Sequence, residues 1–163
     1  MTLAVMALLL GACAAPPRTS VLAPDPGAGG IIIGGIPSER LREIALHALS
    51  HIGVPYRYGG NSPQTGFDCS GLVGYVYSRG AGVRLPRSTE ALSAVGTPVA
   101  PESLEPGDLV FFDTLSKPYS HVGIYLGDER FIHAPATGGH VELVDMRKPY
   151  WRTRFNGARR IAL

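Results

Sequence analysis

The sequence predicts an α+β fold in which helices pack on one face of a five- to six-stranded antiparallel sheet. Two observations predict it: helical periodicity is confined to the first half of the chain, and short β-branched or aromatic runs follow residue 97. Runs of helix followed by runs of strand are typical of α+β proteins. A length of 163 residues and a hydrophobic content of 45% fit one domain with a core of its own.

The first twelve residues are interpreted as a signal peptide that is not part of the fold. Leu3–Ala12 form an apolar run that is too short to span a bilayer and suits the central region of a signal peptide. The stretch LGAC at residues 10–13 resembles the bacterial lipobox, in which the chain is cut before the cysteine and Cys13 receives lipid. A plain secretory signal or an N-terminal membrane-associated segment is the alternative. No Lys or Arg precedes the apolar run, as a signal peptide should have, so a start upstream of Met1 or inefficient export stays open.

Residues 13–37 are expected to form a flexible linker between the lipidated Cys13 and a domain at residues 38–163. Their composition is dominated by Pro, Gly and Ala, which is typical of linkers rather than of folded segments. A protein anchored in this way would face the periplasm. Ala14 and Ala15 favour the outer membrane over the inner membrane, because neither position after the cysteine carries Asp.

A first helix is expected from Ser38, which can cap it, to about Ile52. Apolar side chains recur there with the spacing of an amphipathic helix, at Leu41, Ile44, Ala45, Ala48, Leu49 and Ile52. His47 and His51 lie four residues apart in this helix. Since no carboxylate or third ligand accompanies them, we interpret both as ordinary, partly exposed histidines rather than as metal ligands.

A second helix is expected from Cys69 to about Arg79, with Asp68 as its N-cap. Its buried stripe consists of Leu72, Val73 and Val76, and Cys69 shares that stripe at helical spacing. The cysteine therefore lies at the positive end of a helix dipole and on the apolar side of the helix.

Five short runs are expected to form strands, at residues 108–113, 121–127, 130–134, 141–145 and 158–163. Gly127 and Asp128 mark a tight hairpin between the second and third runs. A three-residue loop there would set His121 opposite His133, with both side chains on one face of the sheet. A two-residue loop would shift the register by one residue and break this pairing.

These positions suit nucleophilic catalysis by a thiol. A helix N-terminus and a nearby imidazolium both favour the thiolate form of Cys69, which is the nucleophile. His121 could accept the thiol proton and return it to a leaving amine, while His133 could hold the first imidazole in one tautomer. Backbone N–H groups after Asp68 could stabilise an oxyanion.

Each of these residues also has a purely structural interpretation. Cys69 alone would be a small buried hydrophobe, and each histidine alone could be a satisfied core residue. A zinc site made of Cys69, His121 and His133 would lack a fourth ligand, and a disulfide would need Cys13, which is already assigned to lipidation. We therefore expect no metal and no cofactor.

A series of motifs runs through the chain from about residue 39 to residue 162: VPYRYGGNSPQTGFDCSGLVGYVY, LPRST, LEPGDLVFFD, SHVGIYLGDERFIHA and RR. In this order they resemble the NlpC-type papain-like cysteine peptidases of bacterial cell walls. The resemblance implies a papain-like fold and cleavage of peptidoglycan stem peptides through an acyl-thioester, commonly next to D-glutamate or diaminopimelate. It implies Cys69 as nucleophile, His121 as base and His133 as the third polar residue.

The resemblance also implies further site residues. Tyr56 matches a residue whose hydroxyl lies near the oxyanion, and Asp68, Ser70 and Ser88 match positions that line the stem-peptide pocket in some relatives. Asp68 and Ser88 have alternative roles as helix N-caps. Arg87 could meet a substrate carboxylate, and a solvated arginine is the alternative.

We therefore expect a lipid-anchored peptidoglycan hydrolase of the cell envelope, a monomer whose partners are stem peptides and a membrane. Two alternatives stay open: a non-catalytic murein-binding lipoprotein, and a papain-like amidase or acyltransferase that acts on another substrate. The formal net charge is only +2, and the charges are scattered, which excludes a nucleic-acid-binding stripe. The adjacent pair Arg159 and Arg160 is interpreted as a solvated strand end.

Overall fold

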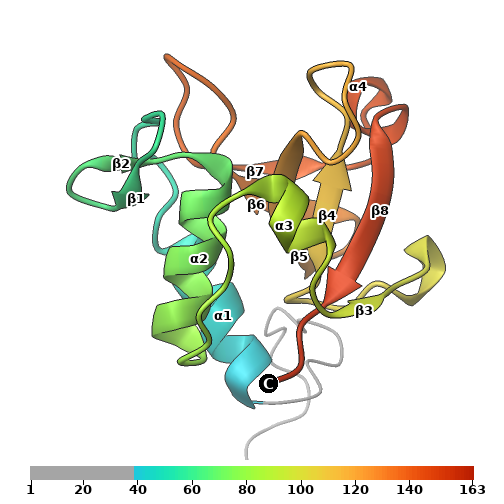
Figure 1. Ribbon diagram of the computed structural model, residues 1–163, viewed down its shortest axis with the longest axis horizontal. Helices are drawn as coiled ribbons and strands as arrows, with labels where there is room; N and C mark the ends of the chain where they lie inside the picture. The colour runs from blue at the N-terminus through green and yellow to red at the C-terminus, as the bar shows by residue number, and fades with distance from the viewer. Residues whose placement is uncertain (1–38) are drawn as a thin grey trace, which may run out of the picture. The chain divides into compact units, whose positions relative to one another are not determined.

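In the described part of the chain, the two long helices pack on one face of a six-stranded antiparallel sheet (Figure 1). The computed structural model describes residues 39–163, so the predicted signal peptide, Cys13, the linker and the Ser38 cap lie outside the described residues. The predicted α+β class and the antiparallel sheet of five to six strands are confirmed. Within residues 39–163, no helix is long and apolar enough to cross a membrane.

The helical segments are α1 (Glu39–Leu49), α2 (Cys69–Gly80), α3 (Thr89–Ser93), the 3₁₀ turn η1 (Pro101–Ser103) and α4 (Pro149–Arg152). The strands are β1 (Asn61–Ser62), β2 (Gly66–Phe67), β3 (Thr97–Pro98), β4 (Leu109–Phe112), β5 (His121–Gly127), β6 (Arg130–His133), β7 (Glu142–Asp145) and β8 (Phe155–Arg160). Across the large sheet the order is β3-β8-β4-β5-β6-β7, and β1 pairs only with β2. The last strand begins three residues before the predicted run.

Helix α2 begins where the sequence predicts, because its N-cap is satisfied. The Asp68 carboxylate accepts a hydrogen bond from the backbone N–H of Gly71 at 2.6 Å. The predicted stripe of Leu72, Val73 and Val76 is fully buried against the sheet. The cap and the stripe together fix which end of α2 carries Cys69.

His51 is buried, so its predicted partial exposure is wrong. Its ring packs against those of Phe67 and Tyr75, with centroids 5.3 Å and 5.2 Å away, and the two aromatic rings also contact each other. Burial lowers the pKa of His51 because the imidazolium loses its hydration, and the neighbouring charge of His47 acts in the same direction. His51 is therefore a neutral packing residue.

Among the described residues, no cluster of three His, Cys, Asp or Glu side chains could hold a metal ion.

The two faces of the sheet belong to different hydrophobic clusters. Leu109 and Phe111 of β4 point to the face that α1 and α2 cover. Val110 and Phe112, which alternate with them, join Phe131 of β6 in a second cluster on the opposite face. Side chains on this second face are covered by α4 and the loops rather than by the two long helices.

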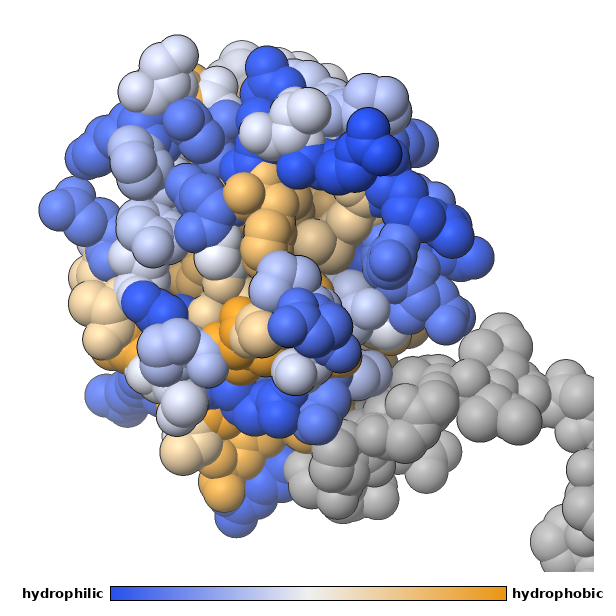
Figure 2. Space-filling model, turned by 90° about the vertical axis from the view of Figure 1, so that its right-hand side faces the viewer, coloured by the Kyte–Doolittle hydropathy of each residue, from blue (hydrophilic) through white to orange (hydrophobic). Residues whose placement is uncertain are grey.

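The second face carries a shallow cavity of about 220 Å³. Its apolar lining consists of Pro101, Leu104, Tyr125, Met146 and Phe155. On the side of the molecule where β3 and β8 lie, apolar residues gather in the middle of the surface and hydrophilic residues surround them (Figure 2).

The hairpin between β5 and β6 differs from the predicted register. Gly127 pairs with Arg130 across a two-residue turn, whose residues Asp128 and Glu129 both have positive φ, at 50° and 55°. Positive φ at both positions is the geometry of a type I′ turn, which matches the twist of the flanking strands. Of the two loop lengths considered from the sequence, the structure has the two-residue one.

A bulge next to the turn brings the side chains of His121 and His133 back to the same face of the sheet. Continued from the turn alone, the register would set His133 opposite Ile124, on the other face from His121. An irregularity inserts Leu126 between the two paired residues, so that Ile124 pairs with Ile132 instead. His133 then falls opposite Gly123, two residues from the predicted partner. The two histidines are diagonal neighbours on one face rather than directly opposed.

Arg160 is an ion-paired residue, so its interpretation as part of a solvated strand end is wrong. Its Nε and Nη2 atoms donate to the two carboxylate oxygens of Asp108, at 2.8 Å and 2.9 Å. Asp108 is 1% exposed, and it also accepts a hydrogen bond from the backbone N–H of Glu105. This bidentate pair joins the end of β8 to the start of β4.

Candidate active site

A cavity of about 340 Å³ lies at the end of the sheet where α2 and β5 begin. Its lining comes from six separate stretches of the chain: Tyr56, Cys69, Thr114, Leu115, Ser120, His121, Pro135, Ala136, Tyr150 and Trp151. The cavity thus brings together three of the predicted site residues, Tyr56, Cys69 and His121, from positions far apart in the sequence. Its size is within the range of small-molecule and peptide-segment sites.

The sulfur of Cys69 lies against the backbone at the start of β5. The backbone N–H groups of Val122, the residue after His121, of Ser70 and of Cys69 itself lie close enough to the thiol to lower its pKa. These contacts place the sulfur between the first turn of α2 and the strand that carries His121. Strand β5 begins at His121, and the side chain of this residue lines the cavity.

The N–H groups of Cys69 and Ser70 also suit an oxyanion. They belong to the first turn of α2, whose N–H groups have no partner four residues earlier in the helix. Tyr56 adds a hydroxyl, and its pKa is raised by burial and by the neighbouring charges of Cys69 and Asp68. The phenol therefore stays protonated and can donate a hydrogen bond to developing negative charge.

The two histidines form a hydrogen-bonded pair. Nε2 of His121 lies 2.7 Å from Nδ1 of His133, and their rings are nearly perpendicular, at 88°. Both rings contact Trp151 of α4, with centroids 5.9 Å and 4.9 Å away. The contacts with Trp151 and Phe131 show that the two rings lie on the face of the sheet opposite the one that α2 covers.

Burial keeps both partners of the thiol–imidazole pair neutral at rest. The pKa of Cys69 is raised, chiefly by burial and then by the Asp68 carboxylate, although the three N–H groups oppose this. Burial lowers the pKa of His121 to about 4. Burial and the neighbouring His121 lower that of His133 to about 3. The predicted resting thiolate therefore gives way to a neutral thiol and a neutral imidazole that line the same cavity, because desolvation outweighs the helix dipole.

This electrostatic state predicts an acid limb of kcat/KM near pH 4, well below the value of 6.5 for a free imidazole. Between pH 6.5 and pH 4, the unfolded chain binds protons at histidine while the native pair stays neutral, so stability falls as pH decreases through this window. Rates should therefore be measured only where circular dichroism shows a folded protein. An acid limb at pH 6 to 7 in folded protein would contradict a buried neutral base.

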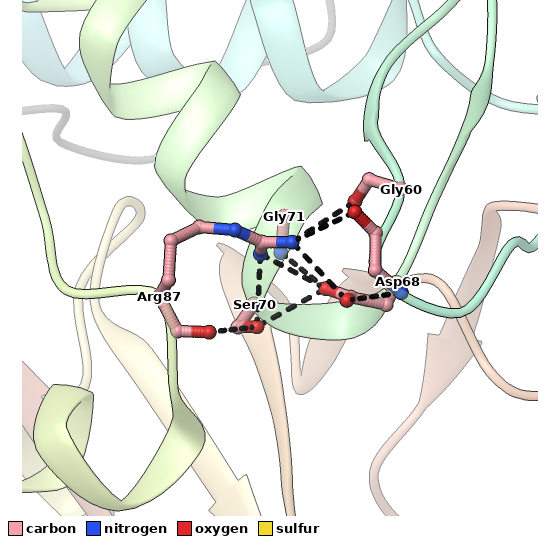
Figure 3. Close-up of polar contacts among 6 residues, drawn as sticks. Gly60, Asp68, Ser70, Gly71 and Arg87 are labelled. Carbon is pink, nitrogen blue, oxygen red and sulfur yellow. Dashed lines mark hydrogen bonds and ion pairs between the residues drawn. The ribbon is translucent and has the colours of Figure 1, made fainter.

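Asp68, Ser70 and Arg87 form a closed network beside the cavity, shown in Figure 3. The guanidinium of Arg87 donates to both carboxylate oxygens of Asp68, at 3.1 Å and 3.2 Å, and to the carbonyls of Gly59 and Gly60. The Ser70 hydroxyl donates to the carbonyl of Arg87 at 2.7 Å. These contacts join the 59–60 loop, the N-cap of α2 and the segment that precedes α3.

The loop and the helix approach each other so closely in this network that only glycine fits at position 71. A Cβ atom on Gly71 would lie 2.0 Å from the carbonyl oxygen of Gly60. Among the described residues, the side-chain hydrogen bonds of Asp68 and Ser70 all lie within this network. Neither residue lines the cavity. Their geometry is that of residues that fix the position of Cys69.

Replacing Arg87 with alanine should lower the free energy of unfolding by about 1 kcal/mol, because this exposed guanidinium bridges three segments and pairs with the largely buried carboxylate of Asp68. Chemical denaturation monitored by fluorescence measures this change. Arg84→Ala removes an exposed arginine from the same loop and is the matched control. Equal stability of the two variants would mean that the network does not hold the N-terminus of α2.

The remaining predicted residue, Ser88, caps α3 through its hydroxyl, which accepts a hydrogen bond from the N–H of Ala91 at 3.2 Å. Within the described part of the chain, it lies outside the cavity lining.

Trp151 and Ser120 are site residues that sequence reasoning missed. Ser120 accepts hydrogen bonds from the N–H groups of Thr114 and Leu115 and so shapes the loop that borders the cavity. The only tryptophan in the chain was the available signal for Trp151.

The fold and site together define a protein of the papain-like class, in which a cysteine at a helix N-terminus meets an imidazole carried by an antiparallel sheet. The family model described as NlpC/P60 family matches residues 53–160, and the chain belongs to this family.

Two curated relatives illustrate the similarity. The chain is 39% identical over 127 residues to murein DD-endopeptidase MepH of Escherichia coli strain K12, covering 76% of this chain and 47% of that protein. It is 45% identical over 118 residues to gamma-DL-glutamyl hydrolase of Bacillus subtilis strain 168, covering 72% and 28%. The chain therefore spans less than half the length of either relative.

A solved structure agrees with the fold. An NlpC/P60 family protein from Bacillus cereus ATCC 10987 superposes with a TM-score of 0.69 at 33% identity, covering 77% of this chain and 41% of that one.

Proposed function

We propose that this protein is a peptidoglycan hydrolase, a cysteine endopeptidase that cleaves the stem peptides of murein. The observation that carries the proposal is the cavity that Cys69, Tyr56 and His121 line together. Membership of the NlpC/P60 family, and relatives named for murein and glutamyl hydrolysis, supply the substrate class.

The residues support a two-step reaction. Nε2 of His121 bonds to His133, so Nδ1 of His121 is the atom left to accept a proton from Cys69. As the proton moves, the sulfur attacks the peptide carbonyl, and the N–H groups of Cys69 and Ser70 with the Tyr56 hydroxyl stabilise the oxyanion. His121 then protonates the leaving amine as the C–N bond breaks, which leaves a thioester. Water attacks the thioester with His121 as base, releasing a carboxylate and the free thiol.

Product analysis tests this function. Purified protein should convert murein fragments into species that each carry a new amine and a new carboxylate within the stem peptide, as measured by mass spectrometry. Protein alkylated at Cys69 is the control and should leave the fragments intact. The masses assign the cut to the D-glutamyl–diamino acid bond or to a crosslink. Murein that binds but is never cut would favour the alternative of a binding protein, and cleavage confined to other amides or esters would favour the amidase or acyltransferase alternative.

We further propose that residues 1–12 are a signal peptide, that Cys13 carries lipid and that residues 13–37 tether a monomeric domain in the envelope, facing the periplasm from the outer membrane. The LGAC stretch and the two alanines after Cys13 support this location. Several acyl chains are required for stable anchoring, since one chain binds membranes only marginally.

Full-length protein should incorporate labelled palmitate and fractionate with outer membranes, and Cys13→Ser should do neither. Label retained by Cys13→Ser would contradict lipidation at this residue.

A further inference from the structure

The second imidazole of the pair has an unsatisfied nitrogen. His133 is 0% exposed, and its Nε2 atom is buried with no hydrogen-bond partner among the described residues. Its Nδ1 atom is already engaged by His121 at 2.7 Å. A buried, unpaired ring nitrogen is costly, so its nearest polar neighbour is of interest.

That neighbour is Glu142. Strand β7 lies beside β6 (Figure 1). In the register of the two strands, Glu142 is paired directly with His133. Oε1 of Glu142 lies 3.5 Å from Nε2 of His133, and the carboxylate side chain is 56% exposed. This separation is too long for a good hydrogen bond, but an exposed side chain can shorten it by rotating.

The protonation states of the two histidines require a hydrogen-bond acceptor beside Nε2 of His133. If Nδ1 of His121 is to receive the thiol proton, Nε2 of His121 must already carry a proton and donate it to Nδ1 of His133. A neutral His133 that accepts at Nδ1 must carry its own proton on Nε2. That N–H points toward Glu142, and a carboxylate can only accept. The reverse arrangement would put a proton on Nδ1 of His133 and leave His121 unable to act as base at Nδ1.

We propose that Glu142 is a positioning residue, which accepts a hydrogen bond from Nε2–H of His133 and thereby fixes the tautomers of both histidines in the order that lets His121 act as base. The inference deepens the proposed function, and its kinetic test rests on that function. Among the described residues, the titratable groups recorded in contact with His133 are His121 of β5 and Glu142 of β7.

The tautomer itself can be observed without substrate. In ¹⁵N–¹H spectra of the labelled full-length protein, His133 should show a protonated Nε2 and an unprotonated Nδ1. The Nε2–H signal should shift or broaden in Glu142→Ala. A wild-type His133 protonated at Nδ1 would overturn the proposal, even if murein cleavage had been demonstrated. Conversely, the expected tautomer in a protein that does not cleave murein would retain this proposal and reject the proposed function.

Kinetics separate the hydrogen bond from the charge. Glu142→Ala removes the acceptor and should lower kcat/KM about tenfold, as expected for one hydrogen bond to a charged group. Glu142→Gln keeps an acceptor oxygen but loses the negative charge. It should therefore keep most of the rate, while its acid limb moves to lower pH by about half a unit.

Glu129→Gln is the matched control. Glu129 is 60% exposed and lies at the other end of β6, in the turn before Arg130, so this change removes the same charge far from the histidine pair. Its rate and pH profile should equal those of the wild type. If Glu142→Ala matches the wild type within twofold and its acid limb is unchanged, Glu142 has no positioning role.

Discussion

Replacing Cys69 with serine should reduce kcat/KM on murein fragments by about 10⁴-fold or more, as removal of a catalytic nucleophile does in other hydrolases. The substitution changes a single atom, so the cavity and the fold should persist. The base is the reason for so large a loss. Burial lowers the pKa of His121 to about 4, and a base this weak is poorly matched to the much less acidic hydroxyl of serine.

The measurement for Cys69→Ser is the initial rate at neutral pH, with circular dichroism as a check on folding. Ser78→Ala alters an exposed residue of the same helix and should retain the wild-type rate. Binding of murein by Cys69→Ser should persist, since the rest of the cavity lining is intact. A variant that kept more than about one hundredth of the wild-type rate would show that hydrolysis does not depend on this sulfur.

The sequence is a sufficient guide to the main elements because local chemistry determines them. Asp68 followed by an apolar stripe determines where α2 begins, and β-branched runs determine β4 to β7. By contrast, α4 has only four residues, too few for any periodic pattern, although it carries Trp151 against both imidazoles. The first residues of β8 were also missed, because Gly157 lies in the middle of the strand.

The pairing of the histidines shows a further limit of sequence reasoning. Their common face depends on a two-residue turn and on a bulge at Leu126. Either feature alone would put the two side chains on opposite faces of the sheet. No local signal in the sequence fixes where a bulge occurs, since it depends on how the finished strands pack. From the sequence, His121 and His133 share one face only if the loop has three residues, whereas in the structure they share it through a two-residue turn and a bulge.

Protonation states were the least predictable part of the site. Position at a helix N-terminus favours a thiolate, and that reasoning from the sequence is sound in isolation. The tertiary structure removes water from Cys69, His121 and His133 together, and this desolvation has the opposite sign. Only packing decides which effect is larger, so a helical position cannot give the charge of the resting pair.

Replacing His121 with alanine should lower kcat/KM at pH 7 by about 10³- to 10⁴-fold, as the loss of a general base does in similar sites. The pKa of the Cys69 thiol is raised by burial, so very little thiolate exists at neutral pH without a base beside the sulfur. The remaining rate of His121→Ala should therefore depend on direct ionisation of the thiol. It should rise about tenfold for each pH unit above 7, whereas the wild-type rate should not.

This pH dependence separates a missing base from a damaged fold, because a collapsed cavity would not recover at higher pH. Free imidazole, which can occupy the space left by the side chain, should restore part of the rate. His140→Ala is the control: His140 is exposed and, within residues 39–163, lies outside the cavity lining, so its loss should leave the rate and the pH profile unchanged. A His121→Ala protein with a wild-type pH profile would mean that another group takes the proton from Cys69, and the histidine pair would then have only a packing role.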